Sequence, residues 1–377
     1  MKLFDVYPLI PVTITRAEAC TLWDEQGEKY LDLYGGHAVI SIGHTHPHYV
    51  QRIKEQLDQI AFYSNSVRIP IQHAFAAKLG ELSCLHDYQL FLCNSGAEAN
   101  ENAIKLASFA TGKSGMIAFS GAFHGRTSAA VALTDNPKIV APCNARTDFH
   151  ILPFGDLEAV ETVLETQEIG GIIIEGIQGV GGIQVPSAEF LLGLEKLAKR
   201  YHAKLILDEV QSGFGRTGRF FAHQWVDGLR PDIISMAKGM GNGFPMGGIL
   251  ICPDFEASYG LLGTTFGGNH LACAAGLAVL EVLEAEKLQQ KAAELGDQLI
   301  EELSKIPQIT QIRGKGLMIG LDLDREAGPV RAELVKKYHI FTGSASKKET
   351  IRLLPPLCVD WNQLNSFISA LKEILKT

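Results

Sequence analysis

Short apolar runs alternate along the middle of the chain with longer stretches in which apolar residues recur at helical spacing. The short runs are hydrophobic at successive positions, which is typical of strands covered on both faces in a mostly parallel sheet. Strands are predicted at residues 88–94, 115–120, 171–177, 203–210, 231–238 and 247–253. Amphipathic stretches between them, such as 97–110 and 187–202, predict helices. This alternation predicts an α/β layered domain.

The two ends of the chain show a different pattern. A long helical pattern runs from residue 269 to about residue 306, and Gly276 and Gly296 are candidate positions for a bend or break in it. Strand-like runs then follow, and WNQLNSFISALKEILK predicts a last helix. We therefore predict an N-terminal segment (1–45) that joins the smaller domain, a large domain (46–260) and a smaller C-terminal α+β domain (261–377).

Composition and charge exclude several classes of protein. Of the 377 residues, 46% are hydrophobic and 20% are charged, which is ordinary for a globular protein. The net charge is −8 and no long basic run occurs, so we expect no nucleic-acid partner. The seven cysteines are scattered without a CxxC pair, which favours reduced thiols in a cytoplasmic protein. Neither a signal-peptide pattern nor a bilayer-length apolar run is present, so no membrane partner is expected.

One lysine, Lys238, stands in the glycine-rich stretch SMAKGMGNGFPMGG, directly after a predicted strand. Burying an uncompensated ammonium is costly, so Lys238 either reaches water or serves as an amine that can become neutral. Asp208 ends the predicted strand in LILDEV, about one βαβ step earlier. Taken alone, Asp208 is expected to be a helix cap or an ion-pair partner. At a shared sheet edge, the two side chains suit pyridoxal phosphate, whose aldehyde binds a lysine and whose ring nitrogen pairs with a carboxylate.

A phosphate site is expected near the same sheet edge. In CNSGAEANENAIKLA (93–107) a strand ends, the chain turns and a helix begins near Ala97. The N–H groups at a helix N-terminus bind phosphate well. The alternative is an ordinary capping box with Ser95 as N-cap and Glu98 three residues later. The lysine–aspartate pair nearby favours the phosphate site.

Two further motifs suggest other chemistry. GFGRTG (213–218) fits the GxGxxG dinucleotide pattern, but its glycines do not follow a strand directly, and Asp208 and Glu209 would repel a pyrophosphate. GHTHPH (43–48) places histidines at alternate positions, as a metal site in a strand would need. Its glycine and proline indicate a turn instead, and no further ligand is evident. We expect neither a nicotinamide cofactor nor a metal.

Three segments carry candidate contacts for a charged substrate. In AFHGRTSAA, Phe123 either stacks on a cofactor ring or packs in the core, and Arg126 either grips a carboxylate or forms a surface ion pair. GTTFGGNHLACAA (263–275) is either an anion contact or a flexible helix start. Arg352 in TIRLLPPL is either half of an ion pair or a carboxylate receptor.

The motifs NSGAEAN, FHGRT, LILDEVQSGFGRTG, AKGMGNGFPMGG, TTFGGN, RGKGLMIG and IRLLPPL occur in this order between residues 94 and 357. As a set they closely resemble the class III pyridoxal-phosphate aminotransferases, and within them the acetylornithine and ornithine aminotransferase group. YLDLYGGHAVISIGHTHP (30–47) resembles that group's N-terminal segment, so the resemblance covers essentially the whole chain. It implies the aspartate-aminotransferase-like fold (fold type I), an α/β fold with a large, mostly parallel sheet domain and a smaller α+β domain.

The resemblance also assigns roles to residues. Lys238 and Asp208 would be catalytic, with Lys238 bound to the cofactor aldehyde and Asp208 paired with the ring nitrogen. Pyridoxal 5'-phosphate would be contacted by Gly96, Ala97, Phe123, Asp208, Glu209, Val210, Gln211, Lys238 and Thr265. Thr265 would reach the neighbouring subunit's cofactor, which implies a homodimer with active sites at the subunit interface. Substrate contacts would come from Arg126, Thr264 and Arg352.

One departure from the family pattern concerns the substrate. The family usually reads EPIQGEGG where this chain reads EGIQGVGG (175–182), with Gly176 and Val180 as replacements. In ornithine aminotransferases the second glutamate resembles a gate that pairs with the arginine at the position of Arg352. We hypothesise that Val180 leaves the pocket open to a differently acylated ornithine, such as succinylornithine.

The activity implied by the resemblance is that of an acylornithine aminotransferase in arginine biosynthesis. Such an enzyme converts N-acetylornithine or N-succinylornithine and 2-oxoglutarate into N-acylglutamate 5-semialdehyde and glutamate. The alternative is an ornithine aminotransferase or another class III omega-aminotransferase.

Overall fold

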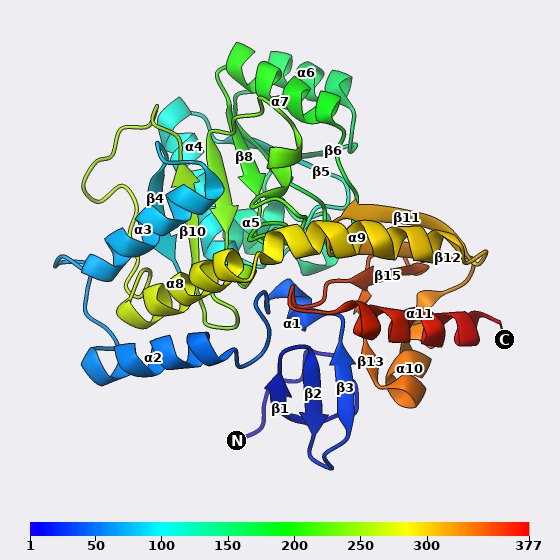
Figure 1. Ribbon diagram of the computed structural model, residues 1–377. Coiled ribbons are helices and arrows are strands. Elements are labelled where there is room, and N and C mark those ends of the chain that lie inside the picture. The colour runs from blue at the N-terminus through cyan, green and yellow to red at the C-terminus, as the bar shows by residue number, and fades with distance from the viewer. Residues whose placement is uncertain (377) are drawn as a thin grey trace.

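The computed structural model describes residues 1–376, and a seven-stranded sheet forms its centre (Figure 1). The strand order is β4-β10-β9-β8-β7-β5-β6. The strands are β4 (Gln89–Cys93), β5 (Gly115–Phe119), β6 (Phe149–Leu152), β7 (Ile169–Glu175), β8 (Lys204–Asp208), β9 (Ile233–Met236) and β10 (Gly247–Ile251). All ladders from β6 to β9 are parallel, whereas β10 pairs antiparallel with β9 and β4. The predicted mostly parallel sheet is confirmed.

Helices cover this sheet, and its central strands are buried. Every residue of β5 and β7 is buried, as continuous apolar runs require in a covered parallel sheet. The helix α4 packs across β7 to β10, and α7 packs on β7 and β8. The longer helices of this part are α2 (Pro47–Gln59), α3 (Pro70–Ser83), α4 (Gly96–Thr111), α6 (Leu157–Thr166) and α7 (Ala188–Arg200). The shorter ones are α5 (Ser128–Ala132), η1 (Pro137–Ile139), η2 (Pro142–Asn144), η3 (Ala222–Trp225) and η4 (Lys238–Met240).

Five of the seven strands lie within the predicted runs, β7 begins two residues before its run, and β6 was not predicted. It is the last strand in the sheet order, and none of its residues is fully buried. An edge strand of mixed exposure lacks the continuous apolar run that marks its buried neighbours.

Two smaller sheets lie outside the central sheet, one below it and the other to its right in Figure 1. Their strands are β1 (Ile14–Glu18), β2 (Thr21–Asp24), β3 (Lys29–Asp32) and β13 (Ile340–Phe341) in one sheet, and β11 (Ile309–Lys315), β12 (Met318–Leu323), β14 (Gly343–Ser344) and β15 (Thr350–Leu353) in the other. The helices beside them are α1 (Gly35–Ala38), α9 (Leu288–Ser304), α10 (Ala327–Tyr338) and α11 (Trp361–Leu375). Because β3 pairs with β13, the N-terminal strands share a sheet with the C-terminal part of the chain. The domain boundaries at residues 45 and 260 stay a prediction.

The long helical pattern after residue 269 is two helices, α8 (His270–Ala285) and α9. The chain breaks at Lys287, which has a left-handed φ of 52°, and not at Gly276 or Gly296 as predicted. Both glycines lie inside helices at close approaches. A Cβ atom at Gly276 would lie 2.6 Å from Cε2 of Phe75, and one at Gly296 would collide with the carbonyl of Gly316. These glycines serve packing and not helix termination.

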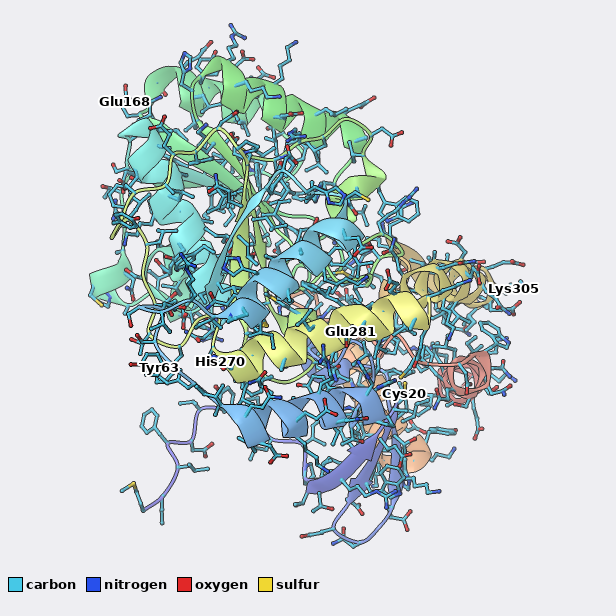
Figure 2. All side chains as sticks on the ribbon, turned by 60° about the vertical axis from the view of Figure 1, so that its left-hand side comes forward. Cys20, Tyr63, Glu168, His270, Glu281 and Lys305 are labelled. Carbon is cyan, nitrogen blue, oxygen red and sulfur yellow. The ribbon has the colours of Figure 1, made fainter. Side chains whose placement is uncertain are left out.

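The three histidines of GHTHPH bind three different carboxylates. His44 Nε2 lies 2.9 Å from Asp32 Oδ2, and Pro47 opens α2. The other two, His46 and His48, contact Glu286 and Glu281 near the C-terminal end of α8. Figure 2 shows Glu281 on α8, which lies between α2 and α3. Among the described residues, no group of three or more His, Cys, Asp or Glu side chains is arranged to hold a metal ion.

Two predictions concern the cysteines, expected to be reduced thiols, and the helices, expected to include no membrane span. All seven cysteines are free thiols, and the Sγ atoms of Cys20 and Cys358 lie 3.6 Å apart. Among the helices of residues 1–376, none has both the length and the apolar character that a membrane span needs.

Candidate active site

A cavity of about 380 Å³ opens at the carboxyl ends of β8 and β9, and the predicted lysine and aspartate both line it. This edge is where ligands sit in open α/β sheets. Asp208, the last residue of β8, pairs with Ser235 of β9, and Lys238 follows three residues later. Predicted site residues on the cavity wall are Gly96, Ala97, Phe123, Arg126, Asp208, Val210, Gln211 and Lys238.

Asp208 is buried, and its carboxylate is held by three donors. His124 Nδ1 lies 2.8 Å from Oδ2, and Asn100 Nδ2 donates to the same oxygen at 2.7 Å. The N–H of Val210 donates to Oδ1 at 3.0 Å. Asn100 is oriented in turn by Ser235, whose hydroxyl donates to its Oδ1 at 2.6 Å. The carboxylate is therefore fixed in one orientation at the cavity wall before any ligand binds.

Lys238 begins the short helix η4 with a left-handed φ of 42°, which is uncommon for a residue with a side chain. Burial lowers the pKa of Lys238, although the carboxylates of Asp208 and Glu175 oppose this shift. No carboxylate of residues 1–376 forms an ion pair with its ammonium. A lysine in such a place is more readily neutral than an exposed one, as a nucleophile or base must be.

The start of α4 lines another part of the cavity wall, with backbone N–H groups in place of charged side chains. The first N–H groups of a helix have no intrahelical partner, and Gly96 and Ala97 supply two of them at the cavity. Ser95 is the N-cap and accepts from the N–H of Glu98 at 3.2 Å. A Cβ atom at Gly96 would lie 2.7 Å from Cγ1 of Val210, so the close approach needs glycine. The capping arrangement and an anion site are thus both compatible with this helix start.

Phe123 lies on a loop that Glu175 holds in place. Glu175 ends β7 beside Asp208, is buried, and accepts from the N–H groups of Phe123 (3.0 Å) and Gly179 (2.8 Å). Burial raises the pKa of Glu175, with the nearby Asp208 adding to the shift and His124 opposing it. The N–H of Gly176 donates to the carbonyl of Asp208 at 3.1 Å, a bond that a proline at this position could not form.

Two arginines stand at the cavity without a carboxylate partner among the described residues. Arg126 is exposed and lines the cavity. Arg352 is buried beside the cavity, where its Nη1 atom lies 3.4 Å from Oε1 of Gln211, a residue of the cavity wall. Its other partners are the carbonyl of Ser344 and the hydroxyl of Tyr34. The ion-pair alternative for Arg352 is therefore not what the structure shows.

Besides Arg352, which contacts the cavity residue Gln211 without lining the cavity itself, three predicted residues are not brought to this cavity. Glu209 is fully buried on the other side of the strand end, where the backbone N–H groups of Ala222 and His223 and the side chains of Ser212 and His223 donate to it. Its carboxylate is therefore satisfied away from the cavity, and the cofactor contact of Glu209 stays a prediction that this carboxylate does not support. Thr264 accepts from Asn94 Nδ2 at 3.3 Å, and Thr265 is exposed in the same loop.

The glycine-rich motif GFGRTG serves packing between the two parts of the chain. Arg216 is buried, and its guanidinium donates to the carbonyls of Pro355, Leu317 and Ile40. A Cβ atom at Gly218 would lie 2.7 Å from that of Ala293 on α9. This loop lies against the smaller sheets and does not offer a phosphate-binding turn at a helix start.

The sequence reasoning missed several residues that shape the site. Glu175 ends an apolar run in GIIIEGI, the same signal that marked Asp208, and was not used. Asn100 and His124 carry no local signal, because each gains its role from a contact with Asp208 across 108 and 84 residues.

The residues present fit pyridoxal phosphate. A held carboxylate, a lysine of lowered pKa and a helix N-terminus with free N–H groups surround one cavity. The Nε2 atom of His124, which lines this cavity, is buried and has no partner among the described residues. These are the polar groups that this cofactor needs at its ring nitrogen, aldehyde and phosphate.

Comparison with curated proteins points the same way. The sequence matches the family described as aminotransferase class-III over residues 5–375. It is 40% identical over 380 residues to an acetylornithine aminotransferase of Bacillus subtilis (strain 168), covering 99% of this chain and 97% of that protein. An acetylornithine aminotransferase of Mycolicibacterium smegmatis is 39% identical over 388 residues, covering 98% of this chain and 95% of that protein.

Solved structures share the fold. An acetylornithine aminotransferase from Elizabethkingia anophelis superposes with a TM-score of 0.85 at 30% identity, covering 98% of this chain and 96% of that one. An ornithine aminotransferase from Toxoplasma gondii ME49 gives a TM-score of 0.89 at 27% identity, covering 97% and 90%. Another structure of the Toxoplasma gondii enzyme is described with partial occupancy of PLP at its active site. With the family match spanning residues 5–375, the chain belongs to the class III aminotransferases, the transaminases that use pyridoxal phosphate.

Proposed function

We propose that this protein transfers the terminal amine of an N-acylated ornithine to 2-oxoglutarate. The observation that carries the proposal is the pair of arginines, Arg126 and Arg352, left without carboxylate partners beside the cavity of Lys238 and Asp208. Both substrates carry carboxylates, which arginine binds in a bidentate manner. The full-length likeness to relatives named acetylornithine aminotransferases supports the same choice.

Each residue then has a chemical task. Bound pyridoxal phosphate supplies an aldehyde that takes up the amine and a ring that accepts electron density from the reacting carbon. Lys238 Nζ removes the proton from the carbon bearing the reacting amine and later returns it, for which its lowered pKa is suited. Asp208, held by His124 and Asn100, would face the ring nitrogen, and the N–H groups of Gly96 and Ala97 would hold the phosphate.

The two half-reactions share one pocket. In the first, Arg126 would hold the α-carboxylate of the acylornithine, and the acyl group masks the α-amine, so only the terminal amine reacts. In the second, Arg352 would hold a carboxylate of 2-oxoglutarate, which leaves as glutamate. Released N-acylglutamate 5-semialdehyde is the other product, and arginine biosynthesis is the pathway that such a reaction serves.

We further propose that the acyl group extends to succinyl. Val180 is half-buried, and its carbonyl accepts from the N–H of Ser346 at 2.9 Å, two residues from the Ser344 carbonyl that binds Arg352. The family's glutamate at this position would place a negative charge near a succinyl carboxylate. Valine removes that repulsion and leaves Arg352 uncompensated.

We also propose a homodimer with shared active sites, from the position of Thr265 and of the apolar side chains around it. Thr265 lies outside the cavity of its own chain, in a loop flanked by exposed apolar side chains. These are Phe62, Tyr63, Val67, Tyr259 and Phe266. The segment of Tyr63 lies beside the start of α8 at His270 (Figure 2), where the N–H of Leu271 donates to the carbonyl of Ala61. A second copy covering this face would bring Thr265 toward the partner's cofactor.

The test is a coupled assay of glutamate formation from 2-oxoglutarate, run with acetylornithine, succinylornithine and free ornithine. A strong preference for an acylated donor supports the proposal. Equal or faster turnover of free ornithine would make the protein an ornithine aminotransferase or another class III omega-aminotransferase.

A further inference from the structure

Neutral groups alone hold the buried guanidinium of Arg352. Its Nε donates to the carbonyl of Ser344 at 2.5 Å, Nη1 lies 3.4 Å from Gln211 Oε1, and Nη2 donates to the hydroxyl of Tyr34 at 3.1 Å. Burial lowers the pKa of Arg352. No acid among residues 1–376 forms an ion pair with it. The guanidinium thus keeps its full charge for a ligand while its position is set by uncharged partners.

The fold makes room for Tyr34 at this place. Gly343 pairs with Arg352 between β14 and β15, and a Cβ atom at Gly343 would collide with the ring of Tyr34. The guanidinium carbon lies 5.7 Å from the centroid of that ring. A Cβ atom at Gly35 would lie 2.9 Å from the carbonyl of Leu354, so the loop after Tyr34 is pressed against the end of β15.

His37 completes a directed hydrogen-bond chain. Its Nδ1 lies 2.6 Å from the hydroxyl oxygen of Tyr34. Arginine only donates, so the Tyr34 oxygen accepts from Arg352, and its own proton is left for His37 Nδ1. In the neutral imidazole with the hydrogen on Nε2, Nδ1 accepts this proton. A protonated His37 would instead donate from Nδ1 to the Tyr34 oxygen, which would reverse this bond and place a second cation on the oxygen that accepts from Arg352.

The charges around His37 favour this neutral form. His37 is exposed at the surface, but partial burial of its ring lowers its pKa, and the cations Arg352 and Lys238 lower it further. Arg331 of α10 belongs to the same cluster: it lowers the pKa of Tyr34, and Arg352 lowers the pKa of Arg331 in turn. At Arg352 itself, Tyr34 and Glu175 oppose the lowering of the pKa by burial. Gln211 is neutral and donates from Nε2 to the carbonyl of His37 at 3.0 Å.

We propose that Tyr34 and His37 are positioning residues that hold Arg352 for a substrate carboxylate, with a neutral His37 as the required end of the chain. This rests on the proposed function, since it takes Arg352 as the carboxylate receptor. A carboxylate side chain paired with Arg352 would neutralise its charge. The hydrogen-bond chain of Tyr34 and His37 instead orients Arg352 and leaves its charge in place. Carboxylate binding should consequently weaken when His37 becomes protonated.

The experiment measures the equilibrium binding of glutarate, a dicarboxylate without a reacting amine or ketone, to the holoenzyme by calorimetry between pH 5.5 and 8. Tyr34→Phe is expected to raise the Kd of glutarate about tenfold at pH 8, because a hydrogen bond to a charged group is lost. His37→Asn places Oδ1 where Nδ1 lies, tolerates the left-handed φ of 69°, and cannot be protonated in this range. It is expected to bind like the wild type at pH 8 and to lose less affinity at pH 5.5.

Tyr30→Phe is the matched control, because the hydroxyl of Tyr30 lies 3.2 Å from Asp24 Oδ2 and does not contact Arg352. Protonation of glutarate itself affects all variants alike. The proposal is overturned by an unchanged Kd in Tyr34→Phe, by identical pH profiles of the wild type and His37→Asn, or by a wild type that does not bind glutarate. Turnover of acylornithine tests the proposed function separately, so the two failures can be told apart.

Discussion

The Nδ1 atom of His124 lies 2.8 Å from Oδ2 of Asp208, and the adjacent residue Glu209 forms the same kind of pair with His223 at 2.9 Å. All four side chains are buried. The two pairs differ in place, since Asp208 lines the cavity and Glu209 does not. A comparison of the two pairs by mutation therefore separates the effect of a buried histidine–carboxylate pair on stability from its effect on cofactor binding.

We predict that His124→Ala and His223→Ala each lower the free energy of unfolding by about 1–3 kcal/mol, because each leaves a buried carboxylate with one donor fewer. Only His124→Ala should weaken pyridoxal-phosphate binding, because only Asp208 is placed to contact the ring. The measurements are denaturant unfolding and cofactor titration by absorbance. Equal losses of cofactor affinity in both variants would contradict the role given to Asp208.

Lys238→Ala should lower kcat by at least about 10²-fold while the fold is kept. The reason is that Lys238 is the proposed base, and its ammonium has no ion pair within residues 1–376 whose loss would destabilise the protein. Single-turnover kinetics and the melting temperature check both statements. The control is Lys199→Ala on α7, where an exposed lysine pairs with Glu195 at 2.5 Å. Near-normal turnover in Lys238→Ala would exclude it as the catalytic base.

Val180→Glu should lower kcat/KM for succinylornithine relative to acetylornithine by at least about tenfold, since it adds a like charge near the second carboxylate. Val185→Glu, at an exposed position of the same segment, controls for the added charge alone. The ratio of the two donors is measured in parallel assays. If Val180→Glu leaves that ratio unchanged, Val180 does not select the acyl group.

The pair of Asp208 and Lys238 could be predicted from the sequence because only two consecutive strands are needed to bring the two residues together. Asp208 ends β8 and Lys238 follows the end of β9 by two residues, and these consecutive strands are also neighbours in the sheet. Parallel neighbours share an edge, so the rule for strand ends was sufficient. The same rule would have found Glu175 at the end of β7.

Contacts between distant segments lie beyond such rules. Tyr34 and Arg352 are 318 residues apart in sequence and meet only because the loop after β3 packs against the end of β15. The position of the Glu209 carboxylate outside the cavity was not foreseen for a related reason. Adjacent residues at a strand end point to opposite faces, so Asp208 and Glu209 diverge, and the sequence motif alone does not state which one faces the ligand. The glycines of α8 and α9 were likewise misjudged, because their close neighbours, Phe75 and Gly316, come from other elements.

Asp322 offers a test of the contacts that join the sheet of β11, β12, β14 and β15 to the segment around Gly182. It is buried, and Arg313 donates to both its oxygens at 2.8 and 2.7 Å, joined by Lys347 and Thr350 at 2.6 Å each. Arg313 also donates to the carbonyl of Gly182, next to the segment of Val180. We predict that Asp322→Ala lowers the free energy of unfolding by about 3–5 kcal/mol, since it leaves the largely buried guanidinium of Arg313 unpaired. Asp324→Ala, which breaks the exposed pair with Arg325, is the control and should cost at most about 1 kcal/mol.

The pH dependence of this difference has a definite sign. Burial alone would raise the pKa of Asp322, but the hydrogen bonds from Arg313, Lys347 and Thr350 outweigh it and hold the pKa below its usual range. A carboxylate with a depressed folded pKa contributes stability above its unfolded pKa of about 3.9 and loses it as the pH falls toward the folded value. The stability gap between the wild type and Asp322→Ala should accordingly be constant from pH 7 to pH 5 and shrink below about pH 4. A gap that stays constant down to pH 3 in urea unfolding would show that the ionised carboxylate is not the source of the stability.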